Sequence, residues 1–407
     1  MLAYRGKPHV GGQGVYVREM SKALVELGHT VEVFGGPPYP DLDDKVPLHK
    51  FPSLEIFNDH YPGRIPGFWE IKDYPDFVEV CSYLTGNFSE PLSFSMRAFR
   101  ALKQRSDEFD LVIDNGSLAY GNLKIQKKLG LPILGIIHHP ITVDRRLELD
   151  NARTFLERLG KRRWYAFTRM QTRVCQKIQR IITVSESSKE DISHDHKVDI
   201  NKIHVVPIGI DTDFFAPQTD IERIPGRIVS TASADVPLKG LDYLLEAFSR
   251  VVKIFPESTL QVIGSSKKGG HTTRKIEDLS IKDKVHFNKD LSFKEVRDLY
   301  CSSDIVVIPS LYEGFGFAIG EAMACRVPVI TTSGGAIPEV IGNCGITVAP
   351  GNSKELEEAM LKLLPDENLK NSLAEKGFNR IIEHLQWKEA AKLMTESYEA
   401  EIKRMTD

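Results

Sequence analysis

The sequence lacks the features that would place the protein across a membrane, in an oxidising compartment or on a nucleic acid. Its apolar runs fall short of the roughly 20 residues that span a bilayer, and no signal peptide is visible. A formal net charge of −3 over 407 residues argues against nucleic acid as a partner. The cysteines are odd in number and scattered, which favours a reduced, cytoplasmic protein. They are Cys81, Cys175, Cys301, Cys325 and Cys344.

Short β-branched runs alternate with helical patterns along the whole chain, which predicts an α/β protein with parallel sheets covered by helices. Two Rossmann-like units are expected, joined near Ile208-Gly209-Ile210. We place the first domain at 1–208 together with 388–407, and the second at 209–387. Met1–Tyr4 reads as the end of a strand, which suggests a natural start upstream of Met1. The other expected strands are Thr30–Phe34, Leu111–Asp114, Pro132–His138, Arg180–Val184, His204–Pro207, Arg227–Thr231, Thr259–Ile263, Lys284–Phe287, Asp304–Pro309, Val327–Thr332 and Gly345–Val348.

The segment 309–341 carries the strongest functional signal. A strand ends in a glycine-bearing turn, a helix follows, and a second strand then ends in Gly334-Gly335. Glycines let backbone amides approach an anion, and a helix N-terminus favours negative charge, so this is a candidate diphosphate site. Glu313 and Glu321 cannot help to bind phosphate, but they can bind the hydroxyls of a ribose and a hexose. Phosphate and two polyols together indicate a nucleotide sugar.

The Glu-x7-Glu element Glu313…Glu321, within Glu-Gly-Phe-Gly-Phe…Glu-Ala-Met-Ala, resembles retaining glycosyltransferases of the GT-B fold, family 4. The resemblance implies two Rossmann-like domains that face each other across a cleft, with the last helix crossing back to the first domain. The first domain would serve the acceptor and the second the nucleotide-sugar donor. It further implies that a hexose moves, with retention, from a UDP- or GDP-linked donor to a hydroxyl of a glycan, glycolipid or small molecule. No metal or other cofactor is implied.

The same resemblance assigns roles to individual residues. Glu321 would bind the ribose hydroxyls and Glu313 the transferred sugar, while Lys239 and backbone amides would stabilise the departing diphosphate. The glycine turn Gly11-Gly12-Gln13-Gly14 would close over that diphosphate, with Gly12 the best candidate. The candidate catalytic residues are His138, Glu313 and Lys239. The candidate donor-binding residues are Gly11, Gly12, Ser233, Gly314, Phe315, Gly316, Phe317 and Glu321.

The chain departs from the family pattern just before Lys239. Family members carry a Gly-Arg pair there, whereas residues 230–238 contain no arginine and include Asp235. Another cation could substitute, or Ser233 and backbone amides could suffice, or the activity could be weakened or lost. The candidate cations are Lys267, Lys268 and Arg326.

Two further polar motifs each have a functional and a structural interpretation. His138 and His139 end a predicted strand, where open α/β sheets carry ligands. His138 matches the family's functional histidine best and His139 is second, although a histidine bonded to a backbone carbonyl is the ordinary alternative. Asp211-Thr212-Asp213 looks like a metal-binding Asp-x-Asp, but its place at the predicted hinge favours a turn or a cap. Ser187–Glu190 reads as a capping box.

Residues 145–180 hold eleven basic residues against three acids. A stripe from Trp164 to Ile178 could lie on an anionic membrane surface, which would imply a lipid-linked acceptor and a peripheral location at the inner face. The alternative is a stripe that faces the core, with a solvated basic back.

Residues 36–75, with eight prolines, are either an acceptor-facing lid or a surface excursion. Rival functions are a catalytically quiet sugar-nucleotide-binding protein and a GT-B sugar-nucleotide epimerase or hydrolase.

Overall fold

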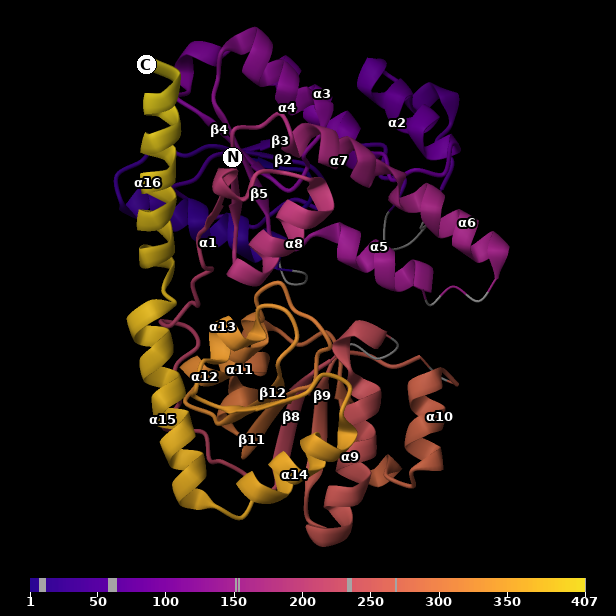
Figure 1. Cartoon of the computed structure of the whole chain (residues 1–407), viewed down its shortest axis with the longest axis vertical. Coiled ribbons are helices and arrows are strands. Elements are labelled where there is room, and N and C mark those ends of the chain that lie inside the picture. Colours follow the sequence, from indigo (N-terminus) through magenta and orange to yellow (C-terminus); the bar gives the residue numbers. More distant parts are fainter. Residues whose placement is uncertain are drawn as a thin grey trace. The chain divides into compact units, whose positions relative to one another are not determined.

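The computed structural model describes residues 1–6, 12–57, 64–150, 152, 154–232, 236–267 and 269–406. Gly11, Ser233 and Lys268, named above as candidates, lie outside these ranges. The chain forms two compact units, shown in Figure 1. The first comprises Met1–Pro207 and Ala390–Asp407, and the second Ile208–Glu389. The sequence pattern predicts these divisions at 208 and 388.

The first unit is built on a seven-stranded parallel sheet in the order β3-β2-β1-β4-β5-β6-β7. Strand β1 lies in the interior of this sheet: Leu2 pairs with Phe34 of β2 on one side and with Asp114 of β4 on the other. Buried aliphatic side chains of β4, β5 and β6 form the core with the covering helices. The strands are β1 Leu2–Ala3, β2 Val33–Gly35, β3 Leu48–Lys50, β4 Val112–Asn115, β5 Ile133–Ile137, β6 Arg180–Thr183 and β7 Ile203–Val205.

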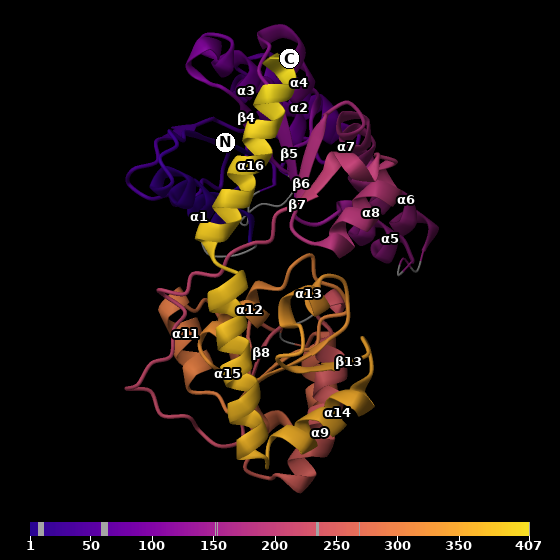
Figure 2. The same cartoon turned by 60° about the vertical axis from the view of Figure 1, so that its left-hand side comes forward.

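Helices cover this sheet because a crossover between parallel strands needs a connection long enough to hold one. Figures 1 and 2 both show α5 and α6 side by side at the margin of the unit. The helical elements are α1 Gln13–Glu26, η1 Phe68–Glu70, α2 Tyr74–Leu84, α3 Glu90–Leu102, η2 Ser106–Glu108, α4 Tyr120–Lys124, η3 Ile125–Leu129, α5 Ile141–Asp150, α6 Phe155–Trp164, η4 Tyr165–Phe167, α7 Thr168–Cys175, α8 Glu186–His196 and η5 Ile200–Lys202.

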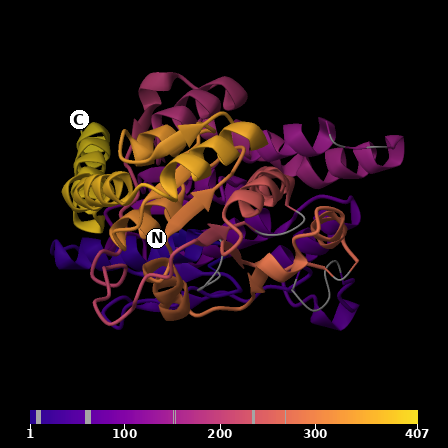
Figure 3. The ribbon, with the colours of Figure 1, turned by 90° about the horizontal axis from the view of Figure 1, so that it is seen from below.

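The second unit has a six-stranded parallel sheet in the order β10-β9-β8-β11-β12-β13. Figure 3 views it from below, with strands between helices. Helices α9 and α14 bury an apolar face together against the sheet. The strands are β8 Arg227–Thr231, β9 Thr259–Ile263, β10 Val285–Asn288, β11 Ile305–Ile308, β12 Val329–Thr332 and β13 Ile346–Val348. The helical elements are η6 Pro237–Lys239, α9 Leu241–Ile254, α10 His271–Asp278, η7 Lys282–Lys284, α11 Phe293–Cys301, α12 Phe317–Ala324, α13 Ile337–Ile341, α14 Ser353–Leu363 and α15 Glu367–His384.

The two chain segments that connect the units lie against each other within the second unit. Ile210 N–H donates to the Leu385 carbonyl at 2.8 Å. A Cβ on Gly209 would lie 2.2 Å from the backbone nitrogen of Trp387, so only glycine permits this approach. The last helix, α16 (Trp387–Thr406), begins here, and its residues from Ala390 onward belong to the first unit. Figure 2 shows α16 directly after α15.

The predicted strands correspond to observed strands whose ends differ by a few residues, but two local predictions were wrong. Strand β3 lies inside the segment 36–75, which had been predicted to be irregular. Its burial is only partial and its apolar pattern correspondingly weak. The cap of α8 is Ser185, which accepts from the N–H of Ser188, so the cap precedes the predicted box at Ser187.

Candidate functional site

In the second unit, three loops meet where β8, β11 and β12 end, because these strands are neighbours in a parallel sheet. Two glycines in left-handed conformations allow the contact. A Cβ on Gly240 (φ +67°) would lie 2.0 Å from the carbonyl oxygen of Pro309. A Cβ on Gly335 (φ +65°) would lie 2.4 Å from that of Glu313. The loops that carry Lys239 and Glu313 are therefore held in place by backbone contacts that no other residue allows.

Lys239 and Glu313, both predicted to be catalytic, form an ion pair. Lys239 Nζ donates to Glu313 Oε1 at 2.7 Å, and Ser310 Oγ donates to the same oxygen at 2.6 Å. Lys239 ends the short helix η6, and Glu313 lies in the loop between β11 and α12. The pair gives the site one fixed carboxylate and one cation that can turn to a bound phosphate.

The glycine turn positions the start of α12. Gly316 is the N-cap in a left-handed conformation (φ +104°), and the helix begins at Phe317. Phe315 is buried and its ring lies 5.6 Å from that of Phe317, which anchors the turn. The first N–H groups of a helix have no partner within it, so this turn can offer donors to an anion. Gly314 lies in the same turn.

Glu321 lies in the second turn of α12 and is partly buried. Burial raises the pKa of its carboxyl to about 7, and the nearby Tyr300 hydroxyl partly offsets that increase. Tyr300 in turn hydrogen-bonds Thr231 Oγ1 at 2.8 Å. Glu321 is thus a carboxyl whose charge changes near neutral pH, fixed beside the end of β8.

In the first unit, His138 follows β5 and contacts the end of the neighbouring strand β4. Its Nε2 lies 2.6 Å from Oδ1 of Asn115, and its ring meets that of Tyr16 edge-on at 4.4 Å. Burial lowers the pKa of His138 to about 4, so the imidazole is neutral at physiological pH. His139 instead pairs with Asp144 of α5, Nε2 to Oδ1 at 2.9 Å.

Gly12 is the N-cap of α1 and has a left-handed conformation (φ +70°). Its carbonyl accepts the N–H of Tyr16 at 2.8 Å, which closes the first turn of the helix. A Cβ on Gly116 would lie 3.7 Å from Gln13 Nε2, so this glycine turn lies near the end of β4. The N-terminus of α1 and His138 therefore occupy the same edge of the first sheet.

Two of the candidate cations for the missing arginine can be placed. Arg326 follows the C-terminal end of α12, about 12 Å along the helix from its N-terminus. There it pairs with Glu375 at 3.1 Å and covers the ring of Phe378, so it is held away from the glycine turn. Lys267 is exposed in the loop after β9, the neighbour of β8. Among the described candidates, Lys267 therefore fits the role better.

Asp211 makes a turn, as predicted: its Oδ1 accepts the N–H of Phe214 at 3.1 Å. Within the ranges that the structure describes, no three His, Cys, Asp or Glu side chains gather as a metal site would require. Metal independence itself stays a prediction.

Several residues that complete these groups were not predicted from the sequence, because each is an ordinary polar or aromatic residue with no motif of its own. They are Ser310 beside Glu313, Tyr300 and Thr231 beside Glu321, and Asn115 and Tyr16 beside His138. Ser310, Thr231 and Asn115 lie at or just after strand ends, which is the one signal that could have found them.

Both halves of the chain match glycosyltransferase families. Residues 10–214 match the family described as Glycosyltransferase Family 4, and residues 225–366 match Glycosyl transferases group 1. The chain belongs to glycosyltransferase family 4, has the GT-B fold of two Rossmann-like domains, and is a glycosyltransferase.

A relative similar over its whole length is the MMP alpha-(1->4)-mannosyltransferase of Mycolicibacterium hassiacum, 42% identical, with 100% of this chain and 98% of the relative covered. The mannosylfructose-phosphate synthase of Agrobacterium fabrum is 24% identical over 94% of this chain and 85% of its own. The sucrose-phosphate synthase of Thermosynechococcus elongatus has the same fold, with a TM-score of 0.71 at 19% identity and 98% of each chain covered. Family membership favours transfer over the quiet, epimerising and hydrolysing alternatives.

Proposed function

We propose that this protein transfers a mannosyl residue from a nucleoside-diphosphate donor to a hydroxyl of a glycan, forming an α-(1→4) linkage with retention. The observation that carries the proposal is its full-length 42% identity to an α-(1→4)-mannosyltransferase. The mannosyl residue of the donor is linked to UDP or GDP, and no metal is required. An α product formed from an α-linked donor is by definition retention.

For the second unit we propose that the N–H groups from Phe315 to Phe317 and the Nζ of Lys239 bind the diphosphate. Donor binding would divide the Lys239–Glu313 pair, so that Glu313 contacts the hydroxyls of the transferred sugar while Lys239 takes the phosphate. Glu321 would accept hydrogen bonds from the ribose. Lys267 would supply the second positive charge that the family arginine provides elsewhere.

For the first unit we propose that Gly12 contacts the diphosphate through its backbone and that His138 contacts the transferred sugar. The imidazole is neutral, so it binds hydroxyls by hydrogen bonds and contributes no positive charge. Asn115 fixes one ring nitrogen of His138, which leaves the other for the substrate.

The bond between the anomeric carbon and the phosphate oxygen breaks, and a bond to the acceptor oxygen forms on the same face. The proton of the acceptor hydroxyl passes to the leaving phosphate oxygen, which develops the charge that Lys239 and the amides stabilise. This reaction needs no oxidant, no reductant and no nucleophile from the protein.

The test is a donor screen with UDP- and GDP-linked sugars against an α-(1→4)-linked mannobiose, with EDTA present. We expect turnover with the mannose donor only, an α-anomeric proton in the product by NMR, and a loss of about 100-fold in kcat/KM for Lys239→Ala. Ser280→Ala is the control, because Ser280 lies between α10 and the start of β10, at the opposite edge of the parallel sheet. Donor binding without turnover with every acceptor would favour the quiet alternative, and a requirement for added metal would contradict metal independence.

We also propose contact with an anionic membrane surface, at a place that differs from the predicted stripe. Phe167, Gln171, Val174 and Ile178 are buried, so that part of the stripe faces the core, as the alternative stated. Helix α6 instead carries exposed apolar and basic side chains together, a combination that suits an anionic lipid surface. They are Phe155, Leu156, Leu159, Arg158 and Arg162.

Co-sedimentation with vesicles tests this contact. We expect binding to vesicles that contain anionic lipid, weaker binding to neutral ones, and loss of binding in Phe155→Ala/Leu156→Ala. Equal binding to both kinds of vesicle, or none to either, would contradict it.

Among the described residues, no helix is both long enough and apolar enough to cross a bilayer.

A further inference from the structure

Two aromatic side chains, Phe68 and Trp69, stand almost fully exposed on the short helix η1 of the first unit. Their relative exposures are 83% and 73%, and their rings lie 5.3 Å apart at 76°. Exposing a large aromatic side chain to water is unfavourable in free energy. An adjacent exposed pair therefore indicates a surface that a ligand or another molecule covers.

The loop that carries the pair is held in one conformation. Arg64 makes a two-pronged ion pair with Glu70, at 3.0 and 2.7 Å, and also donates to the Leu54 carbonyl at 2.6 Å. Glu70 accepts the N–H of Gly67 at 2.8 Å through one of the same oxygens. The arginine and this N–H lower the pKa of Glu70 to about 2, so the clamp stays charged at any physiological pH.

The indole ring of Trp69 has a defined position on this loop. A Cβ on Gly67 would lie 2.4 Å from Cζ2 of its indole ring, so the ring packs directly over the glycine. One side of the indole is thus fixed against the backbone, while most of its surface is open to solvent. This is a preformed flat surface, which costs little entropy to occupy.

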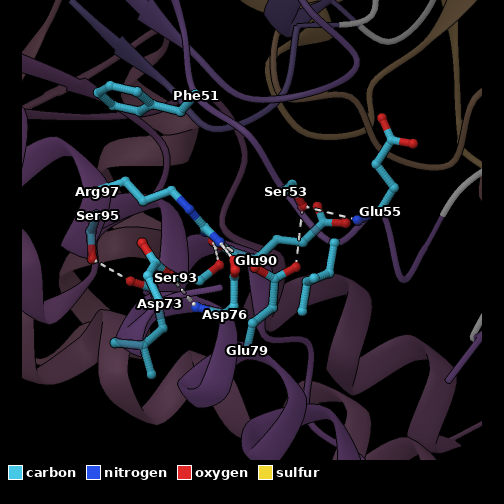
Figure 4. A network of polar contacts seen from close by, with 12 residues as sticks. Phe51, Ser53, Glu55, Asp73, Asp76, Glu79, Glu90, Ser93, Ser95 and Arg97 are labelled. Atoms are coloured by element: carbon cyan, nitrogen blue, oxygen red, sulfur yellow. Dashed lines mark hydrogen bonds and ion pairs between the residues drawn. The ribbon is translucent and has the colours of Figure 1, made fainter. Parts of the chain in front are cut away.

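The helix that follows is tied to the core by a buried polar network, shown in Figure 4. Arg97 of α3 pairs with Asp76 and with Glu79 of α2, and Glu79 accepts from Ser53 at 3.1 Å. Arg97 and Glu79 are almost completely buried. The network therefore fixes both the segment before the aromatic pair and the helix after it.

The aromatic loop comes after β3, so it belongs to the connections at the carboxyl edge of the first sheet. His138 follows β5 and Asn115 ends β4 at that same edge. Arg5, which follows β1 at this edge, donates to the Phe57 carbonyl at 2.8 Å, and Arg64 donates to the Leu54 carbonyl. The base of the aromatic loop is thus tied to the edge where ligands of such sheets bind.

The surface around the aromatic pair differs from α6 in its charge. Residues 64–75 contain two basic and two acidic residues, so this surface has no excess of positive charge, whereas α6 is basic. The next two acids, Asp76 and Glu79, are buried against Arg97. An anionic lipid surface is therefore disfavoured at the aromatic pair. A neutral polyol has no such conflict, and a pyranose ring presents a flat C–H face that stacks on an aromatic ring while its hydroxyls stay in water.

We propose that Phe68 and Trp69 form a subsite that stacks sugar rings of the acceptor glycan at a distance from the residue that reacts. The inference rests on the proposed function and deepens it: the enzyme would prefer long acceptors to short ones. The subsite adds binding for chains long enough to reach it and leaves the chemical step unchanged.

The kinetic test compares a short α-(1→4)-linked mannooligosaccharide with a long one, using the mannose donor. For Phe68→Ala/Trp69→Ala we expect KM for the long acceptor to rise about tenfold, with kcat and the short acceptor's KM unchanged. Leu84→Ala, which removes another exposed apolar side chain at the end of α2, is the matched control and should change neither.

Tryptophan fluorescence supplies a readout that needs no turnover. The chain has three tryptophans, so a Trp164→Phe/Trp387→Phe protein reports on Trp69 alone. We expect the long mannooligosaccharide to shift its emission to shorter wavelength and the short one not to. Gly67→Ala, which displaces the indole but keeps it, should weaken that response.

The outcomes are distinguishable. No transfer to either acceptor refutes the proposed function, and the fluorescence titration then still decides the subsite. Transfer to both acceptors with equal KM, unaffected by the double variant, overturns the subsite alone. A change in the oligomeric mass of the double variant, measured by light scattering, would identify the pair as an interface between copies and would also overturn it.

Discussion

At the scale of single residues, the candidate site consists of charges and hydrogen bonds whose strength depends on burial. Glu321 and His138 illustrate opposite effects of the same cause. Removing water from a carboxyl raises its pKa, and removing it from an imidazole lowers the pKa, because both changes disfavour the charged form. The pKa of each group therefore depends on its surroundings, and its residue type alone does not give it.

Donor affinity should depend on pH through Glu321. Its pKa is raised to about 7, so the carboxylate forms as pH rises through that value and can then accept two ribose hydroxyls. We expect the donor Kd, measured by calorimetry, to fall several-fold between pH 6 and pH 8. Glu321→Gln cannot ionise and should bind weakly with no such dependence; an equal pH dependence in this variant would assign the effect to another group.

Asn115 should control the titration of His138. A carboxylate at 115 would favour the imidazolium, so Asn115→Asp should raise the pKa of His138 well above about 4. NMR titration of the ring protons measures this directly. The His139 signals, whose partner Asp144 is untouched, serve as the internal control, and an unchanged His138 titration would show that the two side chains are not in contact in solution.

At the scale of elements, the loops after β8, β11 and β12 place Lys239 beside Glu313. Glycines at two left-handed positions make the contact, so the geometry depends on backbone conformation as much as on the charged side chains. Lys239 and Glu313 are 74 positions apart in the sequence, so it is the packing of these loops that brings them together.

Gly335→Ala should therefore damage activity more than stability. The added Cβ would press on the Glu313 carbonyl and displace its loop. Gly130→Ala is a matched control, because Gly130 has a similar φ of +72° but nothing within 4 Å of the added atom. We expect each change to cost about 1–2 kcal/mol from the left-handed conformation, and only Gly335→Ala to lower kcat/KM. Equal kinetic losses in both variants would point to a general loss of folded protein.

At the scale of the whole molecule, the chain leaves the first unit at Pro207 and returns to it at Ala390. The returning helix α16 is part of the first unit's fold: His29 Nε2 lies 3.0 Å from Thr395 Oγ1, and Met394 and Tyr398 are buried. The first unit thus depends on residues almost four hundred positions from its first strand.

Truncation of Met394 tests that dependence. Met394 is 0% exposed, so Met394→Ala should cost about 2–5 kcal/mol of unfolding free energy, measured with urea. Leu393→Ala, at a position 41% exposed, should cost far less. Hydrogen exchange should place the lost protection in the first unit, around α1. Equal loss throughout the second unit would show that the two units unfold as one.

The sequence by itself determined the alternation of strands and helices, the two Rossmann-like units and the family, because apolar periodicity and the Glu-x7-Glu element are local patterns. It also named Lys239, Glu313, Glu321 and His138 as candidates, since each adjoins a strand end or a glycine turn. Strand β3 was missed because its partial burial left little apolar pattern.

Only the tertiary structure decided which residues surround these groups. Ser310, Tyr300 and Asn115 became visible through hydrogen bonds to residues 3 to 69 positions away. The apolar stripe from Phe167 to Ile178 and the aromatic pair at Phe68 read alike in the sequence, as apolar side chains among polar ones. The stripe is buried and the pair is exposed because burial depends on the elements that pack on a residue, and these come from distant parts of the chain.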